Sequence, residues 1–230
     1  MKLTDWKSWH APGALDVHGI LALAGIVGPL VLILTDLIAA FSTPKYNFIR
    51  DSISSLALTS LGWIQTIGFL VIGLLVEIFT AGLFLNIHGK RGFGLSIGLL
   101  VCFGFGLLLI GAFRTDPVGA SHTIEGIIHI IASFAVFWFF PIAISLLLPS
   151  LKNDPYWRGM FLYTIVTCML ALALAVGRLF LPVRLSWFGL YERILVANAV
   201  IWIEVAAIRL ILLSMQRQRE AKQTNHTAER

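Results

Sequence analysis

The sequence predicts an all-α integral membrane protein, a polytopic bundle of six transmembrane helices. Of its 230 residues, 58% are hydrophobic and only 13% are charged, and the mean hydropathy is +0.87. Soluble domains carry about 25% charged residues, so this chain lacks the polar surface that a soluble globule of its size needs. Six long apolar runs are the second observation, and the short connections between them, which leave no room for a soluble domain, are the third.

Each apolar run is long enough to cross the hydrocarbon core, which takes about 20 mainly apolar residues in a helix. None of the runs shows the two-residue alternation of a transmembrane β-strand, so all six are predicted to be helices. Because the connections are short, consecutive helices should be antiparallel neighbours. The predicted spans are Gly19–Phe41, Trp63–Ile87, Phe93–Ala112, Thr123–Leu148, Gly159–Leu181 and Ile194–Leu213.

The sequence predicts a single transmembrane domain with both termini in the cytoplasm. We expect this domain over residues 1–215, followed by a short, mobile, polar tail over residues 216–230. Six spans place both termini on one side, which holds eleven of the 17 Lys and Arg residues, against six on the other side. Cytoplasmic loops are enriched in Lys and Arg, so the terminal side is predicted to be cytoplasmic and the protein to be a multi-pass component of the cell membrane.

The charge pattern argues against a nucleic-acid-binding role. The net charge is +5, but the basic residues are scattered singly and form no basic face interleaved with aromatic residues. The two cysteines, Cys102 and Cys168, each lie within an apolar run and show no metal or redox spacing. Membrane lipids are therefore the expected partners, and the pattern indicates neither a cofactor nor an oligomeric state.

Polar side chains gather in the three loops on the side opposite the termini. The loops on the terminal side are poorer in mixed polar groups, so we predict a polar pocket that faces outward. The polar residues are Tyr46, Asn47, Arg50, Asp51, Ser52, Ser54 and Ser55 in the first loop, Arg114, Asp116, Ser121 and His122 in the second, and Arg178, Arg184, Tyr191, Glu192 and Arg193 in or beside the third.

The fourth predicted span carries the most informative group of polar residues. His122, Glu125 and His129 are spaced i, i+3 and i+7, which places them within an arc of about 60° on one helix face. His129 would lie about 10 Å below the helix start, inside the hydrocarbon. Ionisable groups at that depth face the bundle interior and by default mark a functional path. Ser133 continues the same stripe.

Three interpretations of this group stay open. A metal site would combine the two histidines and Glu125 with Asp116 or Asp51 from a neighbouring loop. An acid–base site would set one histidine, oriented by a carboxylate, against a serine such as Ser52 or Ser54. A structural network would only join helices through hydrogen bonds. The residues to which we assign a catalytic role are Ser52, Asp116, His122, Glu125 and His129.

Two carboxylates fall close to the middle of a span, Glu77 in the second and Glu204 in the sixth. An ionised carboxylate at the bilayer centre is costly, so each is expected to be protonated, paired or facing water. One interpretation is a hydrogen bond to a neighbouring helix. The other is a proton path past Glu204, Glu77 and His129, which Asp36 near the outer end of the first span could join.

Five arginines lie in or beside the outward loops. If several converged, their forked donors would bind the phosphate or carboxylate of a headgroup. The alternative is that each arginine pairs locally with Asp51, Asp116 or Glu192. The residues to which we assign substrate binding are Arg50, Asp51, Arg114, Arg178 and Arg193.

Two segments and two histidines resemble a known family. They are Tyr46–Ser54 (Tyr-Asn-Phe-Ile-Arg-Asp-Ser-Ile-Ser), Gly111–Asp116 (Gly-Ala-Phe-Arg-Thr-Asp), and His122 with His129. They are similar to the prokaryotic membrane family catalogued as domain of unknown function 998, and the resemblance covers about Gly19 to Leu213. The family pattern, a serine-bearing loop, a Gly-x-Phe-x-x-Asp segment and a following histidine, implies no settled activity. The matching positions are Ser52, Ser54, Asp116 and His122.

These observations lead to three functional hypotheses. The first is a hydrolase or transferase that acts on a lipid-like or phosphate- or carboxylate-headed substrate, with a histidine as base and arginines on the headgroup. The second is a small proton-coupled transporter that uses the intramembrane carboxylates, and the third is a membrane interaction protein without chemistry. Membrane hydrolases that gather serine, aspartate and histidines around zinc offer a weaker analogy, because this chain lacks a paired His-x-x-x-His on a late span.

Overall fold

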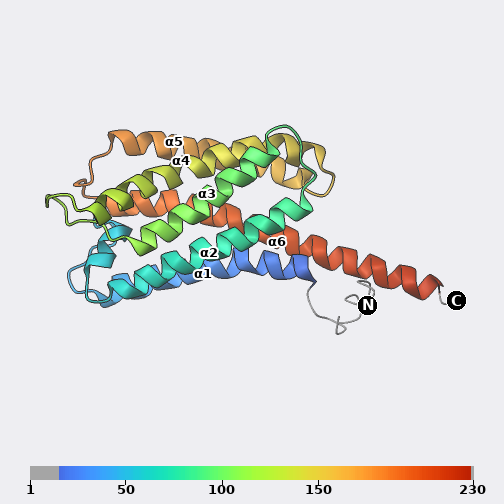
Figure 1. The fold of residues 1–230 in the computed structure, drawn as a ribbon, viewed down its shortest axis with the longest axis horizontal. Coiled ribbons are helices and arrows are strands. Elements are labelled where there is room, and N and C mark those ends of the chain that lie inside the picture. The colour runs from blue at the N-terminus through green and yellow to red at the C-terminus, as the bar shows by residue number, and fades with distance from the viewer. Residues whose placement is uncertain (1–15, 229–230) are drawn as a thin grey trace.

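The computed structural model describes residues 16–228, and these residues fold into a bundle of long helices (Figure 1). Six of the helices are long and apolar enough to cross a membrane. The predicted all-α polytopic fold is therefore confirmed. The six are α1 (Val17–Ser42), α2 (Gly62–Asn86), α3 (Phe93–Ala112), α4 (Ile124–Asn153), α5 (Phe161–Phe180) and α6 (Phe188–Ala228), and two short 3-10 helices are η2 (Ile53–Leu58) and η3 (Arg158–Met160).

The six helices form a closed ring. Each helix packs against the next along the chain, and α6 returns to pack along α1. Small residues allow close packing on both sides of α3. A side chain at Gly106 would collide with Val136 of α4, and one at Gly111 would press on Phe69 of α2. Backbones that approach this closely gain van der Waals contacts, which drive helix association inside a membrane.

The bundle has two ends of different character. What we call the loop end carries the connections 43–61, 113–123 and 181–187, and it includes η2. What we call the terminal end carries the connections 87–92 and 154–160, the start of α1 and the long C-terminal part of α6 (Figure 1). The described chain thus begins and ends on one side of the bundle, as an even number of spans requires.

Helix α6 is longer than predicted at both ends. It begins at Phe188 instead of Ile194, so Glu192 and Arg193 lie on a helix and not in a loop. It also continues to Ala228 through the segment that we expected to be a mobile tail. Residues 216–228 contain no proline or glycine and are rich in good helix formers. Apolar length shows where a helix crosses hydrocarbon, but it does not show where the helix stops.

Candidate functional site

A chamber of about 320 Å³ lies at the loop end, where the three predicted outward loops meet α4, α5 and α6. The three loops therefore line one common space. Of the ten residues predicted to act in catalysis or substrate binding, five do not line the chamber: Arg50, Asp51, Arg114, Glu125 and Arg193. The polar residues that line the chamber are Ser52, Ser54, Thr115, Asp116, His122, His129, Ser133, Arg178 and Glu192.

The most reactive arrangement in the chamber is a pair formed by Ser54 and His129. The Oγ of Ser54 lies 3.0 Å from Nε2 of His129, and Nδ1 of the same ring lies 2.8 Å from the backbone carbonyl of Phe113. A carbonyl only accepts hydrogen bonds, so Nδ1 carries the ring proton and Nε2 is left as an acceptor. The Ser54 hydroxyl therefore donates to a bare ring nitrogen. This is the geometry of a hydroxyl nucleophile next to its general base.

Local structure decides which serine faces the histidine. Ser52 precedes the 3-10 helix η2, and its Oγ accepts a hydrogen bond from the backbone N–H of Ser55 at 3.2 Å. Ser52, to which we assigned the catalytic role, thus caps η2, and Ser54 is the serine that contacts His129. The sequence pattern offered both serines. It could not distinguish them, because the choice depends on the turn that η2 makes after Ser52.

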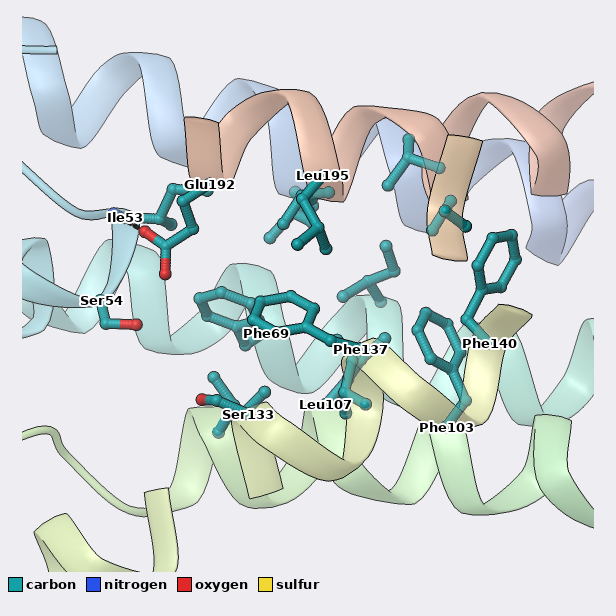
Figure 2. Close-up of a pocket in the computed structure, with 18 residues that line it drawn as sticks. Ile53, Ser54, Phe69, Phe103, Leu107, Ser133, Phe137, Phe140, Glu192 and Leu195 are labelled. Carbon is teal, nitrogen blue, oxygen red and sulfur yellow. Dashed lines mark hydrogen bonds between the residues drawn. The ribbon is translucent and has the colours of Figure 1, made fainter. Parts of the chain in front are cut away.

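Glu192 of α6 holds this turn in place. Its Oε2 accepts a hydrogen bond of 2.6 Å from the backbone N–H of Ile53, the residue before Ser54. The Glu192 side chain lines both the chamber and the space beneath it, and in Figure 2 it lies near Ser54 at one end of that space. The sequence suggested Glu192 only as a partner for arginines. Glu192 is the fifth residue of α6. An acidic residue this close to the start of an apolar helix was the signal that could have identified it.

A narrow apolar cavity of about 50 Å³ runs from the chamber into the centre of the ring (Figure 2). All six long helices contribute to its wall, with residues such as Leu32, Phe69, Phe103 and Leu195. Ser54, Ser133, Phe137 and Glu192 line both the cavity and the chamber. The reactive pair therefore lies where a polar space meets an apolar one.

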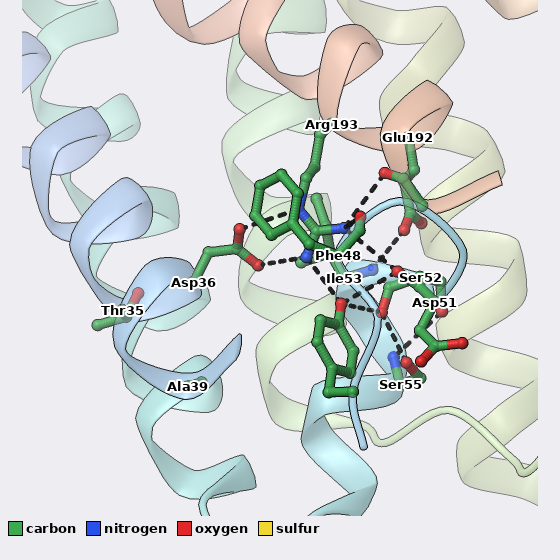
Figure 3. Close-up of polar contacts among 12 residues, drawn as sticks. Thr35, Asp36, Ala39, Phe48, Asp51, Ser52, Ile53, Ser55, Glu192 and Arg193 are labelled. Carbon is green, nitrogen blue, oxygen red and sulfur yellow. Dashed lines mark hydrogen bonds and ion pairs between the residues drawn. The ribbon is translucent and has the colours of Figure 1, made fainter. Parts of the chain in front are cut away.

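Arg193 joins the first loop to α1 and α6 (Figure 3). It forms an ion pair with Asp36 at 3.1 Å, and it donates to the backbone carbonyls of Phe48, Asp51 and Gly189. It also donates to the Tyr46 hydroxyl at 2.7 Å. Burial raises the pKa of Tyr46 to about 12, so this phenol stays protonated. The donors of Arg193 are therefore used in contacts that hold the fold together. Asp36 is the ion-pair partner of Arg193 and is not part of an assembled proton path.

The predicted substrate-binding arginines do not converge. Arg50 pairs with Asp51 next to it, at 2.6 Å, and this hydrogen bond holds the pKa of Asp51 below its usual range. Arg114 is exposed. Arg178 alone lines the chamber, where its guanidinium lies 5.6 Å from the ring centroid of Phe134 and 4.9 Å from that of Phe188. Local pairing thus accounts for Arg50, a distant ion pair with Asp36 accounts for Arg193, and Arg178 is the one predicted arginine that faces the chamber.

The predicted stripe of His122, Glu125 and His129 does not form, because α4 begins only after Thr123, its N-cap. His122 precedes the helix and lies 3.7 Å from Asp116, and Glu125 is exposed outside the chamber. Asp116 accepts hydrogen bonds from the backbone N–H and the hydroxyl of Thr123, which hold its pKa below the usual range. Within residues 16–228, no three His, Cys, Asp or Glu side chains are placed to hold a metal ion.

The two carboxylates at mid-membrane depth lie on different seams of the ring. Glu77 of α2 packs over Gly104 of α3, and Glu204 of α6 lies near Tyr163 of α5. Neither residue lines the chamber or the central cavity. The proposed route past Glu77, Glu204 and His129 is therefore not assembled in this conformation.

Comparison with known proteins gives a family and no activity. A family model described as "Protein of unknown function (DUF998)" matches residues 26–209. That range contains the five predicted catalytic residues and Ser54. No curated protein and no solved structure matches the chain.

Proposed function

Because the chain belongs to the DUF998 family, whose function is unknown, we propose a function from the site itself: an acyl hydrolase or acyltransferase of the membrane. Ser54 is the nucleophile and His129 its general base. The substrate is an amphiphile whose head lies in the chamber and whose apolar chain enters the central cavity. The Lys and Arg bias supports an orientation in which the loop end faces outward and the termini are cytoplasmic.

The observation that carries this proposal is the 3.0 Å contact between Ser54 Oγ and His129 Nε2, with Nδ1 bonded to the Phe113 carbonyl. The third group that orients a catalytic histidine is often a carboxylate, and here a backbone carbonyl takes that place. A carbonyl fixes the tautomer and ring direction without adding a charge to the membrane interior. The chemistry therefore needs no ionised carboxylate beside the histidine.

The reaction follows from these positions. Ser54 Oγ attacks the acyl carbon and forms an ester bond, while its proton passes to His129 Nε2. The bond to the leaving group then breaks, and His129 returns the proton to that group. Water, or the hydroxyl of an acceptor, attacks the acyl-Ser54 ester and gives its proton to His129. The product leaves with the acyl group, and the proton returns to Ser54.

The two spaces around the pair support an amphiphilic substrate. The cavity is apolar apart from Ser54, Ser133 and Glu192 at its mouth, so it suits methylene groups. The chamber adds one cation, Arg178, whose forked donors suit a phosphate or carboxylate in the head. An acyl bond between chain and head would then lie near Ser54.

A fluorophosphonate probe tests the proposal, because it attaches covalently to an activated serine and releases fluoride. The purified protein in lipid nanodiscs should be labelled at Ser54. Ser54→Ala should abolish labelling, and His129→Asn should slow it by about a thousandfold. Ser145→Ala is the matched control, since Ser145 lies on α4 outside both spaces and only bonds the Ile142 carbonyl. If the folded wild-type protein does not react with the probe, the proposed enzymatic function would be overturned.

One observation favours a second candidate, a small carrier. All six helices line the central cavity, as alternating access around a central site would require. A carrier should transport solute into proteoliposomes with a dependence on Glu77 or Glu204, and Ser54→Ala should leave that transport intact. Transport lost with Ser54→Ala would argue against the carrier.

A further inference from the structure

A hollow of about 220 Å³ lies on the flank of the bundle, between α1, α2 and α6. We call it the lateral pocket. Ile33 and Ile201 are among its lining residues and are 43% and 51% exposed. Both belong to membrane-spanning helices, where exposed isoleucine side chains meet lipid tails and not water. The lateral pocket is therefore accessible from the bilayer.

A thin wall separates the lateral pocket from the central cavity. Leu32, Ile53, Phe69, Val196 and Val200 line both spaces. Since the same side chains face both spaces, a single layer of side chains lies between them. These side chains are apolar and make no side-chain hydrogen bonds, so rotamer changes could open the wall without breaking polar contacts.

The lateral pocket also contains an unused hydrogen-bonding group. Gln65 of α2 lines it and is fully buried, yet neither its amide nitrogen nor its amide oxygen has a partner within residues 16–228. Leaving such a group unpaired is costly. The other polar residues of the pocket, Asp36 and Arg193, bind each other, and Arg193 makes further bonds to the first loop. The unused capacity is thus neutral, with both donor and acceptor.

We infer that the lateral pocket binds an acyl chain that carries a neutral amide or ester, taken directly from the bilayer, and that this chain reaches the central cavity through the shared wall. Gln65 supplies the hydrogen bond to the amide or ester, and the apolar walls hold the chain. Binding stands on the pocket and Gln65 alone. The onward route rests on the proposed function, because it delivers the acyl bond to Ser54.

Photo-crosslinking tests the binding step. The probe is an N-acyl ethanolamide with a diazirine in its acyl chain, placed in phosphatidylcholine nanodiscs that hold the full chain. Peptide mapping should find crosslinks concentrated on residues 32–37 and 193–201. Ala197 is exposed and lines the pocket. Ala197→Trp should reduce the crosslinks about tenfold, because the indole ring would displace roughly two methylene groups of the bound acyl chain. Val166→Trp, on the exposed face of α5, is the matched control.

Gln65→Leu separates ligand binding from a structural role. It should reduce crosslinking about fivefold through the lost hydrogen bond and should also raise the melting temperature. A structural glutamine would not produce that combination. Crosslinks spread evenly over α5 and the lateral pocket, or crosslinking unchanged by both Ala197→Trp and Gln65→Leu, would overturn the inference.

A blockade introduced after folding tests the route and keeps the two proposals apart. In a Cys102→Ala background, Ala197→Cys is alkylated with a bulky membrane-permeant maleimide once the protein is purified. Turnover of the bilayer-dissolved amide should fall about tenfold, whereas a water-soluble fluorophosphonate should still label Ser54 through the chamber. Unchanged turnover would overturn the route alone. If Ser54 of the wild type stays unlabelled while crosslinks still form in the lateral pocket, the proposed enzymatic function would be overturned. The proposed binding site would still stand.

Discussion

Two buried amide side chains lie near opposite ends of helix α2 and differ in every contact. Gln65, near the loop end, is fully buried and has no hydrogen-bond partner within the described chain. Asn86, at the terminal end, donates to His18 at 2.9 Å and to the Gly82 carbonyl at 2.8 Å, and it accepts from Arg217 at 2.7 Å. The same functional group is thus saturated at one end and unused at the other.

The difference extends to the histidines of the two ends. At the terminal end, Asp154 accepts hydrogen bonds from the backbone and ring of His88, and from the backbone of Tyr156, each at 2.9 Å. These bonds join the α2–α3 connection to the end of α4. At the loop end, His129 holds a serine hydroxyl beside an open chamber. The terminal end uses its polar groups for packing, whereas the loop end leaves Gln65 without a partner and places His129 beside an open chamber.

The largest expected effect concerns the histidines. His129→Asn should slow fluorophosphonate labelling by about a thousandfold, because the base for Ser54 is lost. His88→Asn, the terminal-end counterpart, should leave the labelling rate unchanged. Labelling rates of both variants in the same nanodiscs make the comparison. Equal rates in both variants would remove the functional contrast between the two ends.

The arginines provide the next contrast, in stability. Arg193→Met leaves Asp36, whose side chain is only 13% exposed, without its partner, and this should lower the free energy of unfolding by about 3–5 kcal/mol. Arg217→Met loses one hydrogen bond at a partly exposed site, which should lower the free energy of unfolding by at most about 1 kcal/mol. Denaturant unfolding in detergent measures both. The double variant Asp36→Leu/Arg193→Met should recover most of the loss, and a failure to recover would show that the bonds of Arg193 to the first loop matter more than the ion pair.

Leucine substitutions at the two amides of α2 should have opposite signs. Asn86→Leu removes the hydrogen bonds to His18, the Gly82 carbonyl and Arg217 and should cost about 2 kcal/mol, whereas Gln65→Leu removes an unpaired buried group and should add about 1 kcal/mol. Melting temperatures of the two variants decide the matter. If Gln65→Leu destabilises the protein as much as Asn86→Leu does, Gln65 has a partner after all.

The smallest effect is a pH dependence at the terminal end. Burial acts to raise the pKa of Asp154, but the hydrogen bonds from His88 and Tyr156 outweigh it and hold the pKa below the ordinary 3.8. The folded pKa is therefore lower than the unfolded one, so the stability contribution is complete above 3.8 and is lost as the pH falls through the folded pKa. Melting temperatures should fall less steeply with acid in Asp154→Asn than in the wild type. Parallel curves would contradict this assignment.

The sequence predicted the architecture well because the bilayer leaves few choices. Backbone in hydrocarbon must satisfy its own hydrogen bonds, so apolar runs of sufficient length become helices, and the six spans follow. Their ends are less predictable. Thr123 caps α4 and leaves His122 outside the helix, and the early start of α6 brings Glu192 and Arg193 onto a helix.

The site was predictable in its residue types and not in its pairings. The sequence predicts that His129 faces the interior, and a serine of the first loop beside it is one of the three interpretations that it leaves open. The choice of Ser54 over Ser52 depends on the turn of η2, and the Phe113 carbonyl that orients the ring belongs to the backbone, so no side chain in the sequence signals it. The arginines show the same limit, since whether Arg193 or Arg178 is free depends on contacts between distant segments.

The tautomer of His129 tests the central claim most directly. NMR of the ring nitrogens in histidine-labelled protein, assigned by comparison with His129→Asn, reports which nitrogen carries the proton. We predict a proton on Nδ1 and a bare Nε2 whose signal shifts in Ser54→Ala. A proton on Nε2, or a spectrum that Ser54→Ala leaves unchanged, would contradict the pairing from which the proposed chemistry is derived.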